Sequence, residues 1–215
     1  MQRESNVADA AREEPVRRGG RPRSPQADEA ILEAGRRLLA EVGFSRMSME
    51  QVARRAGVGK DTLYRRWPSK LVLVRDGILR SAMEAVPVPE TDDPRRDLAV
   101  YLTRVAEFGI TTTFGSIVAG MVGEAYRNPE LATAFQEFAG SRRKTVEALL
   151  RRVLREQGCD DPPDLEMELD LLLAPLYYRR LVSGGPVDGA MFDTLVARLL
   201  PAETPTGCNN TRKGG

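Results

Sequence analysis

The chain contains no histidine, and its two cysteines, Cys159 and Cys208, stand 49 positions apart. Zinc sites are built from histidine and closely spaced cysteine ligands, and histidine is the usual general base of a catalytic triad. The usual zinc sites and histidine-dependent catalysis are therefore excluded. We expect no cofactor, and the sequence favours a function other than catalysis.

Long apolar runs are also missing. No run reaches the length needed to cross a bilayer, and charged residues are scattered through the first 14 positions, where a secretory leader would need an apolar stretch. These absences predict a cytoplasmic protein that makes no contact with a membrane. Lysine is scarce, with 4 residues against 28 arginines, which indicates a GC-rich coding genome rather than a function.

The net charge of +1 conceals an uneven distribution of charge along the chain. Residues 15–80 hold 15 Lys and Arg against 7 Asp and Glu, whereas residues 81–215 hold 15 against 20. A basic segment joined to an acidic one is expected when one domain meets a polyanion and the other does not. Chance segregation of solvated faces is the alternative.

Nonpolar residues recur every three or four positions along most of the chain, and no segment shows the alternation typical of a β-strand. This pattern predicts an all-α fold of about nine helices. The expected helices cover 27–42, 48–57, 60–67, 69–86, 98–108, 114–126, 129–158, 165–177 and 191–200. Pro175 should bend or break the eighth of these, because proline has no N–H to donate to the Leu171 carbonyl.

The segment 43–70 carries the most informative local pattern, two short helices that flank a tight turn. Ser48 and Gln51 have the spacing of a capping box, which begins a helix, and Gly57 is a stop signal that ends it. The pattern is typical of a helix-turn-helix, whose second helix fits the major groove of DNA. Three helices packed for stability alone are the alternative.

At these positions the sequence resembles the TetR family of bacterial transcriptional regulators. The resemblance is carried, in order and at the family's spacing, by Gly43, Phe44, Ser48, Val52, Ala53, Ala56, Gly57, Val58, Thr62, Leu63, Tyr64, Trp67 and Lys70. It covers roughly the first 85 residues, and the remainder is similar only in the number and rhythm of its helices. It implies a homodimeric repressor that a small-molecule effector releases from a two-fold operator.

The resemblance also implies which residues contact double-stranded DNA. Ser48 would offer its hydroxyl to a phosphate, and Lys60, Asp61 and Thr62 would read base edges. Asp61 is equally explained by the helix dipole. The residues expected to contact the DNA backbone are Tyr64, Trp67 and Lys70. Gly59 stands where the family commonly has a hydroxyl residue, so close approach of the backbone would replace one hydroxyl contact.

A cluster of arginines precedes the first helix. Arg17, Arg18, Arg21 and Arg23 alternate with glycine and proline, so this segment can lie extended in a minor groove. We expect Arg21 and Arg23 to contact DNA there. A solvated tail with no ordered contact is the alternative.

The chain is expected to divide into four parts. These are a disordered basic arm (1–24), a DNA-binding domain that includes the linking fourth helix (25–86), an effector-binding and dimerisation domain (87–200) and a flexible tail (201–215). Dimerisation is expected because one module of this size contacts only one half-site. The apolar faces of the last two helices supply the candidates for the interface, which are Leu169, Leu173, Tyr177, Met191, Leu195 and Leu199. Ordinary core packing is the alternative for these residues.

An unknown effector should bind between helices of the second half, where all-helical proteins commonly hold small molecules. The candidates are Phe108, Phe114, Met121, Phe135 and Tyr178, and core packing is again the alternative. One of Arg179 and Arg180, adjacent cations in the otherwise apolar stretch 171–182, is expected to face the interior and to pair with an acid or an anionic ligand.

Two other functions stay open at this point. One is an architectural DNA-binding protein without an effector, for which a filled core in the second half would argue. The other is a helical enzyme that uses carboxylates such as Glu107 or Glu124 without histidine. Such lone acids are usually solvated.

Overall fold

The computed structural model describes residues 25–159, 162 and 164–201. These residues form nine helices and no β-strand, so the predicted all-α fold of about nine helices is confirmed. The predicted basic arm, with Arg21 and Arg23, and all but the first residue of the predicted tail lie outside the described residues.

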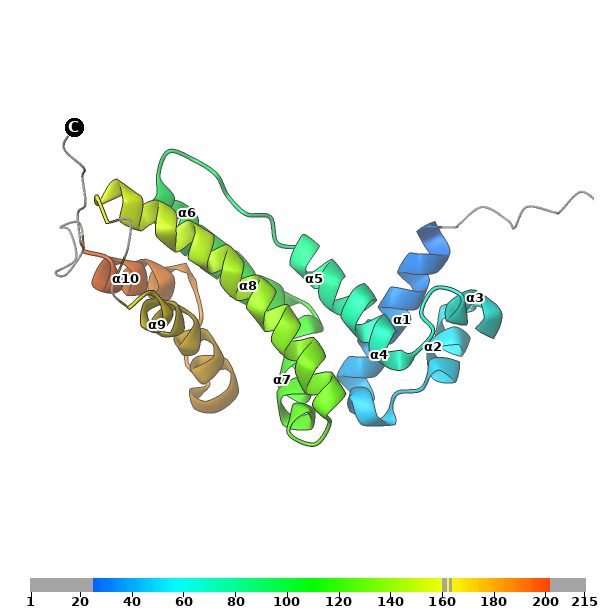
Figure 1. Cartoon of the computed structure of the whole chain (residues 1–215). Coiled ribbons are helices and arrows are strands. Elements are labelled where there is room, and N and C mark those ends of the chain that lie inside the picture. Colours follow the sequence, from blue (N-terminus) through cyan, green and yellow to red (C-terminus); the bar gives the residue numbers. More distant parts are fainter. Residues whose placement is uncertain (1–24, 160–161, 163, 202–215) are drawn as a thin grey trace, which may run out of the picture.

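The first four helices lie together at one end of the molecule (Figure 1). They are α1 (Pro25–Arg46), α2 (Met49–Ala56), α3 (Lys60–Tyr64) and a linking helix that runs from 70 to 84. Within the linking helix, α4 (Lys70–Val72) and α5 (Arg80–Glu84) flank a π-helical stretch, η1 (Leu73–Leu79). We call these four helices the reading head.

The predicted start and stop signals of α2 are confirmed. The Ser48 hydroxyl accepts a hydrogen bond from the Gln51 backbone N–H at 3.2 Å, and the Gln51 side chain accepts one from the Ser48 N–H at 2.8 Å. Gly57 ends the helix at φ +67°, in the left-handed region that favours glycine. Gly43, at φ +76°, interrupts α1 as expected, but helical structure resumes beyond it, so α1 extends past the predicted 27–42.

The second half contains the other five helices. They are α6 (Pro94–Thr111), α7 (Phe114–Ala125), α8 (Pro129–Glu156), α9 (Leu165–Tyr178), which continues into the π-helical η2 (Arg179–Ser183), and α10 (Gly189–Leu199). Pro94 and Pro129 occupy first turns, where the missing N–H removes no hydrogen bond. The helix does not break at Pro175. α-Helical structure continues through Pro175 to Tyr178, and the π-helical stretch, in which hydrogen bonds join residues five positions apart, begins only at Arg179.

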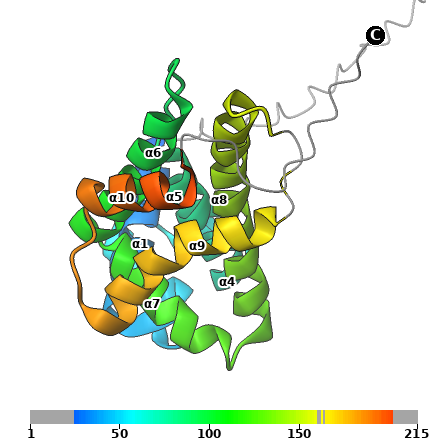
Figure 2. The same ribbon diagram turned by 90° about the vertical axis from the view of Figure 1, so that its left-hand side faces the viewer.

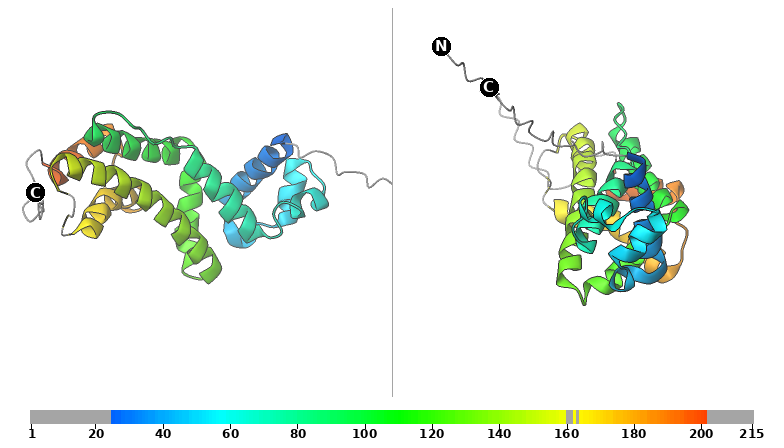
Figure 3. Two further views of the ribbon diagram at one scale, coloured as in Figure 1. Left: turned by 45° about the horizontal axis from the view of Figure 1, so that its top comes forward. Right: turned by 90° about the vertical axis from the view of Figure 1, so that its right-hand side faces the viewer.

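The molecule is elongated, with α3 at one end and with α9 and α10 at the other (Figures 1 and 3). The long helix α8 runs along the second half, and Figure 2 shows α9 and α10 lying across α8 and α6. The second half is held by one cluster of buried apolar residues from α6, α8, α9 and α10, among them Leu98, Leu102, Leu150, Leu172 and Phe192.

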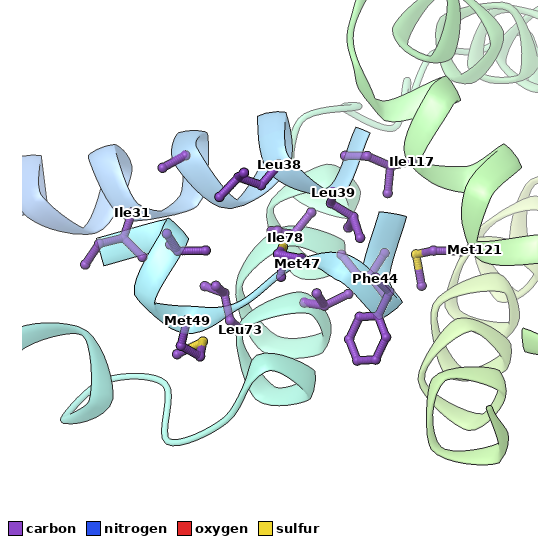
Figure 4. Packing of buried hydrophobic residues seen from close by; sticks show 14 of the residues in the cluster. Ile31, Leu38, Leu39, Phe44, Met47, Met49, Leu73, Ile78, Ile117 and Met121 are labelled. Atoms are coloured by element: carbon purple, nitrogen blue, oxygen red, sulfur yellow. The ribbon is translucent and has the colours of Figure 1, made fainter. Parts of the chain in front are cut away.

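A second apolar cluster joins the reading head to the second half. Its members come from α1, α2, α3 and the linking helix and also from α7 and α8. Figure 4 shows Ile117 and Met121 of α7 packed beside Leu39 and Phe44 of α1. The head and the helix α7 therefore share one continuous core, and a displacement of α7 acts directly on the packing of α1.

Candidate nucleic-acid interface and ligand cavity

The start of α3 is exposed. Gly59 precedes the helix without a side-chain cap, Lys60 and Asp61 are exposed, and Thr62 is half-buried. Leu63 is completely buried in the core of the head and fixes the rotation of this short helix. The burial of Leu63 leaves the first turn of α3 facing outward, at the tip of the molecule (Figure 1).

Glu50, in the first turn of α2, holds two of the candidate DNA-contacting residues. Its Oε1 atom lies 3.5 Å from Lys60 Nζ and accepts a hydrogen bond from the Tyr64 hydroxyl at 3.3 Å. The pKa of Glu50 lies below its ordinary value because of a hydrogen bond from its own backbone N–H and because of the nearby Lys60 charge. The Glu50 carboxylate thus accepts from two donors that were predicted to contact DNA, and the sequence analysis missed this acid.

The three remaining candidates in the described head are tied into the structure. The Ser48 hydroxyl caps α2, and Trp67 is half-buried against the head core, beside Gly77 of the linking helix. Lys70 Nζ donates to the Phe44 carbonyl at 2.7 Å. Burial lowers the pKa of Lys70, while Glu124 acts in the opposite direction. Lys70 therefore fastens the end of α1 instead of projecting from the surface.

A small cavity of about 70 Å³ lies between α6, α7, α8 and the end of α9. Its lining is mostly apolar and consists of Val105, Ala106, Phe108, Gly109, Phe114, Gly115, Val118, Phe138, Arg142, Leu176, Tyr177, Arg180 and Leu181. The rings of Phe108 and Phe138 flank that of Phe114, with centroids 5.3 Å and 5.5 Å from it.

The cavity includes only some of the predicted ligand-binding residues. Phe108 and Phe114 line it, whereas Met121 is buried in the shared core and Phe135 packs against that core. Tyr178 is 59% exposed and is not among the lining residues. Its neighbour Tyr177, a candidate for the dimer interface, lines the cavity instead.

Two arginines belong to the cavity. Arg180 is the member of the Arg179–Arg180 pair that lines the cavity, but it is exposed and donates from Nη2 to the Gly109 carbonyl at 2.8 Å, instead of facing the interior and pairing with an acid as predicted. Arg142 of α8 is buried, and the sequence analysis missed it. The signal was present, because Arg142 falls between Phe138 and Val146 on the inward stripe of α8.

Helix α7 connects the cavity with the head. Phe114, Gly115 and Val118 line the cavity, while Ile117 and Met121 are buried in the shared core. At the far end of α7, Glu124 Oε2 accepts hydrogen bonds from the Ser45 backbone N–H at 2.8 Å and from the Ser45 hydroxyl at 3.0 Å. One helix therefore touches both the cavity and the end of α1, which leads into α2.

The helix α9 and its extension η2 carry an exposed apolar stripe, which we call the α9 stripe. It consists of Met167, Leu171, Tyr178, Leu181 and Val182, spaced so that they follow one face of the helix. Among the predicted interface residues, Leu169 is completely buried inside the subunit. Leu173, Met191, Leu195 and Leu199 are half-buried against the core of the second half.

The described residues contain neither a metal-binding cluster nor a single helix that could span a membrane. No group of three or more acidic or cysteine side chains there could hold a metal ion. No single described helix is long and apolar enough to span a membrane, and α6 and α7 meet that requirement only as a pair bent by 88°.

Comparison with known proteins gives a consistent family assignment. Residues 31–76 match the family model described as bacterial regulatory proteins, tetR family, and residues 88–199 match that of the tetracyclin repressor-like C-terminal domain. The HTH-type transcriptional regulator YdeS of Bacillus subtilis is 31% identical over 178 residues, which cover 82% of this chain and 89% of YdeS. The HTH-type transcriptional regulator AqdR of Rhodococcus erythropolis is 30% identical and covers 63% of this chain and 65% of its own length.

Solved structures agree. The TetR family transcription regulator SCO0332 has a TM-score of 0.65 and 31% identity, and the match covers 84% of this chain and all of SCO0332 (100%). The flavonoid-responsive regulator FrrA shares the fold, with a TM-score of 0.63, 22% identity and coverage of 82% of this chain and 94% of FrrA. Proteins of this family bind DNA and are usually dimers. The chain is a helix-turn-helix transcriptional regulator and belongs to the TetR family.

Proposed function

We propose that this chain acts in the cytoplasm as a homodimeric repressor that leaves a two-fold operator when a small molecule fills the cavity. The observation that carries the proposal is the position of α7. Its start lines the cavity with Phe114 and Gly115, and its middle packs into the core of the reading head with Ile117 and Met121. A ligand that displaces the start of α7 must disturb the packing of α1.

The exposed first turn of α3 supports DNA recognition. A helix of this size fits the major groove, where Lys60 can donate to guanine and the Thr62 methyl group can pack on thymine. A Cβ atom at Gly59 would meet nothing within 4 Å, so the backbone before α3 is open to close approach by DNA. On binding, a guanine would replace the Glu50 carboxylate as acceptor for Lys60, and a phosphate oxygen would replace it for Tyr64.

The α9 stripe supports dimerisation. A row of exposed apolar side chains on a soluble domain marks an interaction surface, because water contact with such a row is unfavourable. A two-fold contact through this stripe would pair it with the same stripe of a second copy. Because α9 lies at the end opposite α3, both reading heads would stay free to meet successive half-sites (Figure 3).

The size of the cavity supports control by a ligand. Cavities that hold drug-sized molecules measure about 300–1,000 Å³, well above the 70 Å³ of this cavity. An effector must therefore widen it, which gives the effector a higher affinity for the widened conformation than for the present one. That difference in affinity is what allows a ligand to shift the protein away from its DNA-bound state.

Footprinting on the DNA that flanks the protein's own gene tests this function. We expect protection of a two-fold site, and we expect Lys60→Ala to weaken it while Lys144→Ala, an exposed lysine of α8, leaves it unchanged. A ligand screen then seeks loss of protection. An architectural protein would protect DNA without two-fold symmetry, and an enzyme would protect nothing.

A further inference from the structure

We propose that the cavity binds a small carboxylate with an apolar body, and that Arg142 recognises the carboxylate group. The inference rests on the proposed function, since it names the chemical class of the effector. Arg142 is a cation placed in the interior of the second half.

Arg142 is 4% exposed and has only neutral partners. Its Nη1 donates to the Tyr101 hydroxyl at 2.8 Å, and its Nη2 donates to the Ala82 carbonyl at 3.2 Å. The rings of Tyr101 and Phe138 each lie 5.8 Å from the guanidinium carbon. Among the described residues, no acidic side chain forms an ion pair with it. A buried charge without a counter-ion is unfavourable, so this site lacks the anion that a carboxylate ligand would supply.

The surroundings of Arg142 define the rest of the ligand. Arginine presents paired N–H groups that match the two oxygens of a carboxylate. The Tyr177 ring also lines the cavity, and burial raises the pKa of its hydroxyl, against a smaller opposing effect of Arg142, so the hydroxyl is a neutral donor. Apart from Arg180 at the exposed rim, the rest of the lining, such as Phe114 and Leu176, is apolar, and no lining residue is an acid. A carboxylate at Arg142 with an aromatic or alkyl body against these side chains satisfies both parts of the site.

Arg142 also links the cavity to the reading head. The Ala82 carbonyl that accepts its hydrogen bond belongs to α5, the last part of the linking helix. The same helix contributes Leu73 and Ile78 to the core of the head. A carboxylate is a stronger acceptor than a backbone carbonyl. Its arrival would draw the guanidinium away from Ala82 and release one tie between α8 and the linking helix.

The first test compares acids with their neutral isosteres on the full chain without DNA. The probes are 3-phenylpropanoate with 3-phenylpropanamide and octanoate with octanamide, titrated by calorimetry. We expect the acid of a pair to bind about 10- to 100-fold tighter than the amide, as charge-assisted hydrogen bonds allow. Arg142→Met should abolish that preference, and Arg155→Met, on the exposed end of α8, should keep it. Equal binding of acid and amide, or a preference that survives Arg142→Met, overturns the proposal.

The second test needs no ligand and separates a binding role from a structural one. Methionine fills a similar space without a charge, and removal of a buried charge that has no counter-ion should offset the loss of the hydrogen bonds to Tyr101 and Ala82, so Arg142→Met should melt at the same temperature as the natural protein or higher. A structural arginine predicts a lower melting temperature, and failure of the variant to fold counts as that result. If no probe binds, the melting temperature of Arg142→Met decides. An unchanged or higher value supports the proposal, and a lower value rejects it.

Operator footprinting distinguishes failure of this inference from failure of the proposed function. A two-fold footprint without any preference for acids rejects only the ligand class. Tight binding of acids without a footprint rejects the regulatory function and leaves the ligand site standing.

Discussion

The contact between the start of α7 and the end of α6 leads to a prediction about Gly115. A Cβ atom at this position would lie 2.1 Å from the Gly109 carbonyl oxygen and 2.5 Å from Arg180 Nη2. The side chain of Arg180 can move aside, but the backbone oxygen of Gly109 cannot. Gly115→Ala must therefore push the start of α7 away from α6, in the direction that widens the cavity.

The size of the effect follows from the cost of overpacking. An extra methyl group in a tightly packed contact costs about 1–3 kcal/mol, and the cost falls on the conformation with the narrow cavity. If that conformation is the one that binds DNA, operator affinity should fall about 5- to 150-fold, at 1.4 kcal/mol for each factor of ten. The affinity for an effector should rise, since the mutation has already displaced α7.

Gly120→Ala is the matched control in the same helix. A Cβ atom there would meet nothing within 4 Å, so this variant gains the helix propensity of alanine, about 0.5–1 kcal/mol, without a clash. Fluorescence anisotropy with a labelled operator duplex compares the two variants with the natural protein. Equal operator affinity of Gly115→Ala and Gly120→Ala would refute the idea that the α6–α7 contact sets the DNA-binding conformation.

The cap of α2, the α9 stripe and the buried Asp97 can each be tested by one substitution. Ser48→Ala should lower the free energy of unfolding in urea by about 1 kcal/mol, because it removes the cap of α2, and an unchanged midpoint would contradict the capping role. Leu171→Glu should disrupt the dimer that we propose through the α9 stripe and give a monomer in sedimentation velocity, and a persistent dimer would place the interface elsewhere. Burial raises the pKa of Asp97, but hydrogen bonds from Thr91 and Arg152 outweigh it and hold this pKa below the ordinary 3.8. The contribution of Asp97 to the free energy of unfolding is therefore complete above pH 3.8 and is lost as the pH falls through the lower pKa of the folded state. When the free energy of unfolding in urea is measured at decreasing pH, it should fall less steeply for Asp97→Asn than for the natural protein.

The reading head was predictable from sequence because its signals are local. The Ser48 and Gln51 side chains act on backbone groups three residues away, and Gly57 acts on its own φ angle. Local spacing could not predict the partner of Lys70, because the Phe44 carbonyl that accepts its hydrogen bond is 26 residues away. A lysine that caps a distant carbonyl and one that meets DNA look alike in a sequence.

The cavity was only partly predictable, and α9 shows why. The helix is apolar on most of its circumference, so the sequence did not reveal which face points inward. Tyr177 and Tyr178 are neighbours separated by one step of rotation, and the structure turns the first into the cavity and the second outward. Arg142 was overlooked for a related reason, since a cation on an apolar stripe looks like a break in the pattern until its burial is known.

The core shared by the reading head and α7 limits how this regulator can be re-engineered. A chimaera that joins the head of a relative to this second half at the 85–93 connection would set foreign side chains against Ile117, Met121 and Leu131. Side chains of mismatched volume in that shared core would weaken the packing of α1 or leave apolar surface exposed to water. Productive exchange of DNA specificity should therefore transplant only the first turn of α3, or carry the matching face of α7 along with the head.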